Sequence, residues 1–184
     1  MIKTRKDLKK YLSIERKLYT SNSRWRSWIA FLLYGRNYIY KYIRLLRYTE
    51  YYYNNSYRKT GSKKGLLNEL FYSIYNKRRN KLGSKLGIEI GLNCCEEGLL
   101  IYHAGFIVIN YKAHIGKNCR LHGCNCIGNG TSGVPTIGNN VVFGVGSSVI
   151  GGITIANSIK IGAGAVVTKS FETPNITIVG IPAK

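Results

Sequence analysis

The sequence is short of acidic residues, of paired metal ligands and of long apolar runs. It has 28 Lys and Arg against 8 Asp and Glu, and its five cysteines include no Cys-x-x-Cys pair. Zinc sites built on such pairs are therefore not predicted. The most apolar stretch, residues 28–48, is interrupted by Gly35, Arg36 and Lys41, which leaves it too short to span a bilayer.

No cleavable signal is recognised at the N-terminus, and the number of cysteines is odd. Both features favour a reducing, cytoplasmic location. We therefore expect the five cysteines to be small, partly buried side chains without disulfides.

Charge and aromatic residues are concentrated in the first half of the chain. Residues 1–85 hold 22 Lys and Arg against 4 Asp and Glu, a net charge of +18, whereas residues 86–184 hold 6 against 4, a net charge of +2. Thirteen of the 15 tyrosines also lie before residue 86. This change predicts a basic, Tyr-rich region at 1–85 and a second domain at 86–184.

The second half repeats every six residues. The leading place of each hexad is aliphatic or Phe, the second is often Gly, and the fifth is often small. The leading residues are Ile109, Ile115, Leu121, Ile127, Ile137, Phe143, Val149, Ile155, Ile161 and Val167.

Six residues fit a short strand and a tight turn, and three such units make a triangular coil of about 18 residues whose leading side chains stack inside. The sequence therefore predicts a parallel β-helix. One step, from Ile127 to Ile137, is four residues longer, so GNGTSGVP at 128–135 is expected to bulge out as a loop.

These hexads, together with GLLIYHAGFIVIN at 98–110, IGAGAVVTK at 161–169 and GIPAK at 180–184, resemble the hexapeptide-repeat acyltransferases. Within that family the chain is most similar to the serine acetyltransferase-like group that includes bacterial polysaccharide O-acetyltransferases. The resemblance implies a mainly β fold, a left-handed parallel β-helix preceded by a basic α-helical region. It also implies a homotrimer with active sites between neighbouring subunits.

The basic first half shows helical spacing of apolar residues at 6–20, 25–53 and 65–82, with no proline. Its charges could be solvated on a helical platform or could lie against an anionic membrane. Trp25 and Trp28 would suit the headgroup level. A peripheral membrane contact through residues 1–60 is therefore kept as a hypothesis. Nucleic acid is not favoured as a partner, because no recognised nucleic-acid module is visible.

His103 interrupts an alternating apolar run, LLIYHAGFIVIN at 99–110, in phase with its buried positions. The run alone allows a core histidine or a base in a dry crevice. The resemblance places His103 at the family's catalytic base, which takes the acceptor's proton as the hydroxyl attacks acetyl-CoA. His122 is the second catalytic candidate, because it replaces the commoner Gly or Ala, and His114 is expected to be solvated.

Three histidines also raise the alternative of a γ-carbonic anhydrase-like metalloenzyme, since that class shares the β-helix. On an 18-residue coil His122 stacks one place off His103, whereas His114 lies more than half a coil from His103. A three-His site within one subunit is therefore not predicted, which leaves only a site with ligands from two subunits. No metal is expected. A non-catalytic trimeric scaffold is the other alternative.

The departures from serine acetyltransferase concern the acceptor. That enzyme has Asp before its base where this chain has Tyr102, and it has an Arg-His pair for the amino-acid carboxylate where this chain has Gly133 and Val134. We therefore expect a saccharide hydroxyl, such as that of a surface-glycan precursor, as acceptor. Serine or another amino acid is the alternative.

Acetyl-CoA is the expected acetyl donor. Gly144, Gly162 and Ala163 would let its pantetheine arm run close to the backbone. The resemblance places Thr168, Lys169, Pro182 and Lys184 near its adenine and phosphate end.

Overall fold

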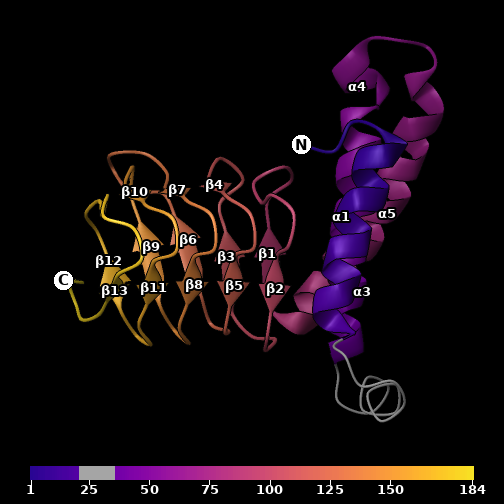
Figure 1. Ribbon diagram of the computed structural model, residues 1–184. Coiled ribbons are helices and arrows are strands. Elements are labelled where there is room, and N and C mark those ends of the chain that lie inside the picture. The colour runs from indigo at the N-terminus through magenta and orange to yellow at the C-terminus, as the bar shows by residue number, and fades with distance from the viewer. Residues whose placement is uncertain (21–35) are drawn as a thin grey trace. The chain divides into compact units, whose positions relative to one another are not determined.

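The computed structural model describes residues 1–20 and 36–184, and the chain divides into two compact units, Met1–Leu86 and Gly87–Lys184. The first unit is helical and the second is a solenoid of short strands (Figure 1). Trp25, Trp28 and the start of the helix expected at 25–53 lie outside the described residues. Among the residues with assigned structure, no helix combines the length and hydrophobicity that a bilayer crossing requires.

The helical unit contains α1 (Arg5–Tyr19), α3 (Arg36–Asn54), α4 (Tyr57–Thr60) and α5 (Gly65–Leu86). Helix α1 begins at a capping box. The Thr4 hydroxyl accepts a hydrogen bond from the Asp7 amide at 3.1 Å, and the Asp7 carboxylate accepts one from the Thr4 amide at 2.8 Å. These hydrogen bonds lower the pKa of Asp7. The predicted helices are confirmed for the described residues.

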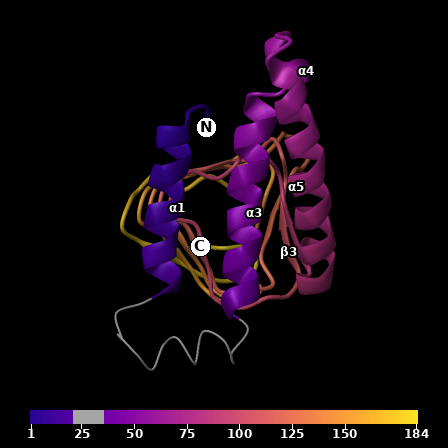
Figure 2. The same ribbon diagram turned by 90° about the vertical axis from the view of Figure 1, so that its right-hand side faces the viewer.

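Helix α3 packs on α1 and on α5, and the three helices run alongside one another (Figure 2). Aromatic rings fill the contact between α3 and α5. Tyr48 stacks on Tyr75 with ring centroids 5.1 Å apart, and Tyr52 stacks on Phe71 at the same separation. Much of the unusual tyrosine content is therefore packing between helices.

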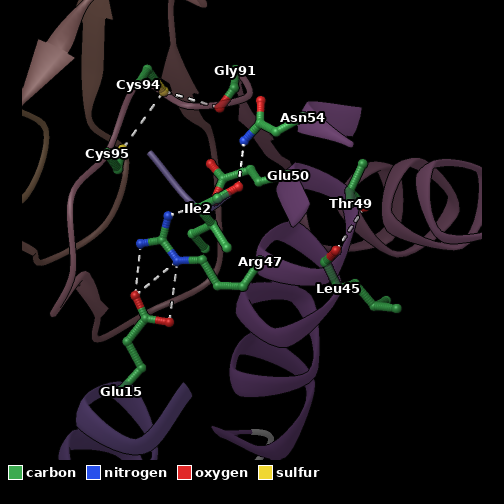
Figure 3. A network of polar contacts seen from close by, with 10 residues as sticks. All are labelled: Ile2, Glu15, Leu45, Arg47, Thr49, Glu50, Asn54, Gly91, Cys94 and Cys95. Atoms are coloured by element: carbon green, nitrogen blue, oxygen red, sulfur yellow. Dashed lines mark hydrogen bonds and ion pairs between the residues drawn. The ribbon is translucent and has the colours of Figure 1, made fainter. Parts of the chain in front are cut away.

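A buried ion-pair network joins α1 to α3 (Figure 3). The Arg47 guanidinium donates to Glu15 from Nη2 at 2.6 Å and from Nε at 3.0 Å, and it donates to Glu50 from Nη1 at 3.0 Å. All three residues are essentially inaccessible to solvent. The network thus places two of the unit's four carboxylates around one cation in its interior.

The solenoid has thirteen strands of two or three residues in three parallel sheets. Sheet A is ordered β1-β3-β6-β9-β12, sheet B is β10-β7-β4, and sheet C is β13-β11-β8-β5-β2. The strands are β1 (Ile88–Ile90), β2 (Leu100–Ile101), β3 (Ile107–Ile109), β4 (His114–Ile115), β5 (Arg120–Leu121), β6 (Cys126–Gly128), β7 (Thr136–Ile137), β8 (Val142–Phe143), β9 (Ser148–Ile150), β10 (Thr154–Ile155), β11 (Lys160–Ile161), β12 (Val166–Val167) and β13 (Thr177–Ile178).

The hexad prediction is confirmed, because all ten leading residues are at most 2% exposed. Regular coils pair residues 18 apart, as Thr136 pairs with Thr154. The coil with the expected loop pairs His114 with Thr136, four residues farther along the chain. In that loop, Gly130 and Gly133 close a small turn through backbone hydrogen bonds of 2.8 and 3.3 Å.

Candidate active site

The candidate residues gather where the chain leaves sheet C. In each coil the inward residue of sheet C is followed by one that faces outward, giving the column Tyr102, His122, Gly144, Gly162 and Val179. The amide of each of the first four donates to the sheet C strand of the next coil, at 2.8 to 3.1 Å. Residues distant in sequence thereby lie one strand spacing apart at one corner, which we call the C–A corner because the chain next enters sheet A.

His103 lies at this corner with an exposed side chain. The alternating pattern of the sequence predicts that His103 is buried, and this prediction is wrong. The strand ends at Ile101, so the chain turns before the pattern can carry His103 inward. The backbone of Gly123, at φ 123°, lies beside His103, since a Cβ there would be 3.3 Å from the His103 Cβ. Within residues 1–20 and 36–184, no hydrogen bond holds the His103 imidazole.

His122 is half-buried and stacks against Tyr102, with ring centroids 4.5 Å apart and an interplanar angle of 27°. The pair arises because Leu100 is in register with Arg120, which brings the next outward residues of the two coils together. Tyr102 stands where the resembling family has Asp. The residue before His103 is therefore an aromatic ring that stacks on His122, rather than a carboxylate.

Gly144 and Gly162 continue the column beyond the histidines. A Cβ at Gly144 would lie 2.5 Å from the amide nitrogen of Ala163 on the next coil, so only glycine fits there. Close packing of the coils thus requires Gly144 whatever binds outside. The absence of side chains also leaves bare backbone along the corner, which fits the approach of an extended ligand such as pantetheine.

Asn125 is a site residue that the sequence analysis missed. Its side chain is fully buried; Oδ1 accepts from the Gly123 amide at 2.9 Å, and Nδ2 donates to the Gly144 carbonyl at 2.7 Å and to Ser147 Oγ at 3.1 Å. It joins the turn beside His103 to the coil that carries Gly144. The sequence does contain a signal for Asn125, because it is an amide at the fifth place of a hexad, where a small side chain is usual.

The remaining donor-site candidates are divided between two corners. Thr168 and Lys169 are exposed after β12, at the far end of that strand from the C–A corner. Lys184 exchanges backbone hydrogen bonds of 3.0 and 3.2 Å with Val179, which places it and exposed Pro182 beside the last residue of the column.

The other polar candidates do not join this corner. His114 is exposed on sheet B, with Nε2 3.6 Å from the Glu96 carboxylate. In the part of the chain that the structure describes, no cluster of three His, Cys, Asp or Glu could hold a metal ion. Cys119 is buried, and burial raises the pKa of its thiol to about 12.

No family model matches the chain, and no curated protein matches it. Solved structures do match. Soybean serine acetyltransferase is 22% identical with a TM-score of 0.71, the alignment covering 97% of this chain and 69% of that one. The chain has the fold of the serine acetyltransferases.

Two further serine acetyltransferases show the same likeness. The enzyme from Brucella abortus in complex with coenzyme A is 21% identical, with a TM-score of 0.72 and coverage of 98% of this chain and 68% of that one. The enzyme from Neisseria gonorrhoeae in complex with serine is 23% identical, with a TM-score of 0.65 and coverage of 97% and 69%. The expected left-handed β-helix preceded by helices is confirmed by this serine acetyltransferase fold.

Proposed function

We propose that the chain is an acetyl-CoA-dependent O-acetyltransferase. The observation that carries the proposal is the gathering of His103, His122, Gly144, Gly162 and Ala163 at one corner of the β-helix. The fold supports it, since a serine acetyltransferase of the same fold has been solved with coenzyme A.

The chemistry needs one base beside the acceptor hydroxyl. Neutral His103 takes the hydroxyl proton while the oxygen attacks the acetyl carbonyl carbon. A C–O ester bond forms, the C–S thioester bond breaks, and the departing sulfur receives the proton from the imidazolium. The bare backbone at Gly144 and Gly162 fits the donor arm, and exposed Lys169 and Lys184 would meet its phosphates.

The comparisons favour serine as acceptor over the saccharide expected from the sequence, because the Neisseria gonorrhoeae structure of this fold contains serine. A saccharide is the second candidate. It is favoured by the half-buried Tyr102–His122 pair, whose flat aromatic surface beside His103 suits the apolar face of a sugar ring.

Acetyl transfer is expected when the purified chain meets acetyl-CoA and a hydroxyl acceptor. Free thiol release would be measured with L-serine and with a panel of neutral and acidic sugars, and the products would be identified by mass spectrometry. Turnover should survive a chelator, since His103 needs no metal to accept a proton. Absence of product with every acceptor, or activity that chelation removes and zinc restores, would contradict the proposal.

A homotrimer with active sites between neighbouring subunits is part of the proposal. Phe106, Val145 and Ile181 are 69%, 50% and 75% exposed in one subunit, and all three lie in C–A corner segments. A neighbouring subunit packed on this corner would cover these apolar side chains and enclose His103.

We further propose that the basic unit contacts anionic membrane from the cytoplasmic side. Helix α1 and the residues before it expose seven cations: Lys3, Arg5, Lys6, Lys9, Lys10, Arg16 and Lys17. Each cation close to an anionic surface contributes about 1 kcal/mol, and a trimer multiplies the contribution.

Co-sedimentation with phosphatidylserine vesicles is expected, and it should weaken as salt shortens the screening length. Replacing Lys6, Lys9 and Lys10 with Gln should weaken it at least ~10-fold. A control that replaces Lys63, Lys77 and Lys81 removes as many exposed charges from outside residues 1–60 and should bind nearly as well. Equal binding to neutral phosphatidylcholine vesicles would refute the proposal, and so would an equal loss in the control.

A further inference from the structure

The outer surface of sheet C carries positive charge and no acid. Its inward residues are buried, so the preceding residue of each strand faces out. Arg120 on β5 and Lys160 on β11 are exposed, with Val142 on β8 between them. The other outward residues are Leu100 and Thr177.

Neither cation has a compensating carboxylate among the residues that the structure describes. Over the described ranges, 1–20 and 36–184, the structure gives neither the Arg120 guanidinium nor the Lys160 ammonium an ion pair or side-chain hydrogen bond. By contrast, Lys117 lies 3.4 Å from the Glu97 carboxylate. Strand β8 lies between β5 and β11, so the backbones of these two strands are roughly 10 Å apart. The long side chains of Arg120 and Lys160 can therefore converge over Val142.

Arg120 is also next to the candidate active site. It lies two residues before His122 on the same outward face, and it is in register with Leu100, two residues before Tyr102. The guanidinium therefore belongs to the surface that continues from the Tyr102–His122 pair. An acceptor whose hydroxyl lies at His103 could therefore extend its other groups toward this surface.

We propose that Arg120, with Lys160 beside it, forms an anion subsite that binds the carboxylate of the hydroxyl acceptor. This inference rests on the proposed acetyltransferase function. Gly133 and Val134 in the loop after β6 carry no charge, and Arg120 supplies the cation from a strand. The planar guanidinium matches a carboxylate through two parallel hydrogen bonds. The ligand class is a carboxylate-bearing alcohol, either a hydroxy amino acid or an acidic sugar.

The test compares Arg120→Gln, Arg120→Lys and Lys160→Gln with Lys112→Gln, which removes an exposed charge beyond sheet C. The paired acceptors are L-serine with L-serinamide, and glucuronate with glucose. Arg120→Gln should lower kcat/KM for the carboxylate member of the productive pair by roughly tenfold to hundredfold, the usual worth of a charge-assisted hydrogen bond. The neutral member and the KM for acetyl-CoA should not change, Arg120→Lys should lose less, and Lys112→Gln should lose nothing.

An equal loss for charged and neutral acceptors would overturn the subsite, as would no loss at all. A change confined to the KM for acetyl-CoA would overturn it as well, because the bound anion would then be a phosphate of the donor. Binding is read separately from activity by following the Arg120 Nε–H resonance while L-serine, glucuronate or their neutral partners are added. If the carboxylate ligands alone shift the Arg120 resonance but no acetyl transfer occurs, the subsite is supported and the acetyltransferase function is rejected. If acetyl transfer occurs but the resonance does not shift, the acetyltransferase function is supported and the subsite is rejected.

Discussion

Replacing His103 with alanine is expected to lower acetyl transfer by at least ~10²-fold, the usual contribution of a general base. Because His103 is exposed, the variant should keep its fold and its unfolding midpoint. The measurement is kcat at saturating acetyl-CoA, together with circular dichroism and the sedimentation coefficient of the variant.

His114→Ala is the matched control, since His114 is also exposed on the β-helix and lies beside Glu96 rather than at the C–A corner. It should retain wild-type turnover. His122→Ala separates the two candidate bases: it removes the ring that stacks on Tyr102 and should cost less than His103→Ala. If His122→Ala abolished turnover and His103→Ala did not, the base would be His122.

Replacing Arg47 with alanine is expected to destabilise the helical unit by about 3–5 kcal/mol, because Glu15 and Glu50 would remain buried without their cation. Denaturant unfolding followed by tyrosine fluorescence or near-UV circular dichroism reports mainly on this unit, since 13 of the 15 tyrosines lie in residues 1–85.

Arg44→Ala is the control on the same helix, because Arg44 is exposed and its guanidinium carbon lies over the Tyr40 ring, 5.9 Å from the ring centroid. It should change stability by less than about 0.5 kcal/mol. A triple variant, Arg47→Met with Glu15→Gln and Glu50→Gln, removes all the buried charge and should recover part of the loss. An Arg47→Ala protein as stable as the Arg44→Ala protein would show that water or another group compensates the carboxylates.

The solenoid could be predicted from the sequence because one residue in every six points inward and must be apolar, and this repeat is visible in the sequence. Ile109, Leu121, Phe143 and Ile161 are buried for the same local reason, and each coil repeats the same requirement. The gathering of His103 with Gly144 and Gly162 also follows from the repeat, since equal spacing along the chain becomes adjacency across coils.

What the sequence did not reveal depends on register and on where strands stop. His103 continues an alternating pattern past the end of β2, so its exposure follows from a turn that the pattern cannot show. Arg120 lies opposite Leu100, and His122 opposite Tyr102, because this coil pairs residues 20 apart rather than 18. Asn125 matters through backbone groups of two different coils, and no local motif marks such a residue.

Successive residues of the column at the C–A corner lie one coil apart, so a distance along the solenoid axis can be counted in coils. Tyr102, His122, Gly144 and Gly162 each come from a separate coil, so the interval from Tyr102 to Gly162 is three strand spacings, about 14 Å. An 18-residue insertion between β5 and β8 would lengthen this interval by one spacing, and the inward residues of the added coil would pack between Leu121 and Phe143, which now adjoin. Gene duplication within the repeat is therefore a means by which such a protein can change the distance between the proposed donor and acceptor sites without changing either of them.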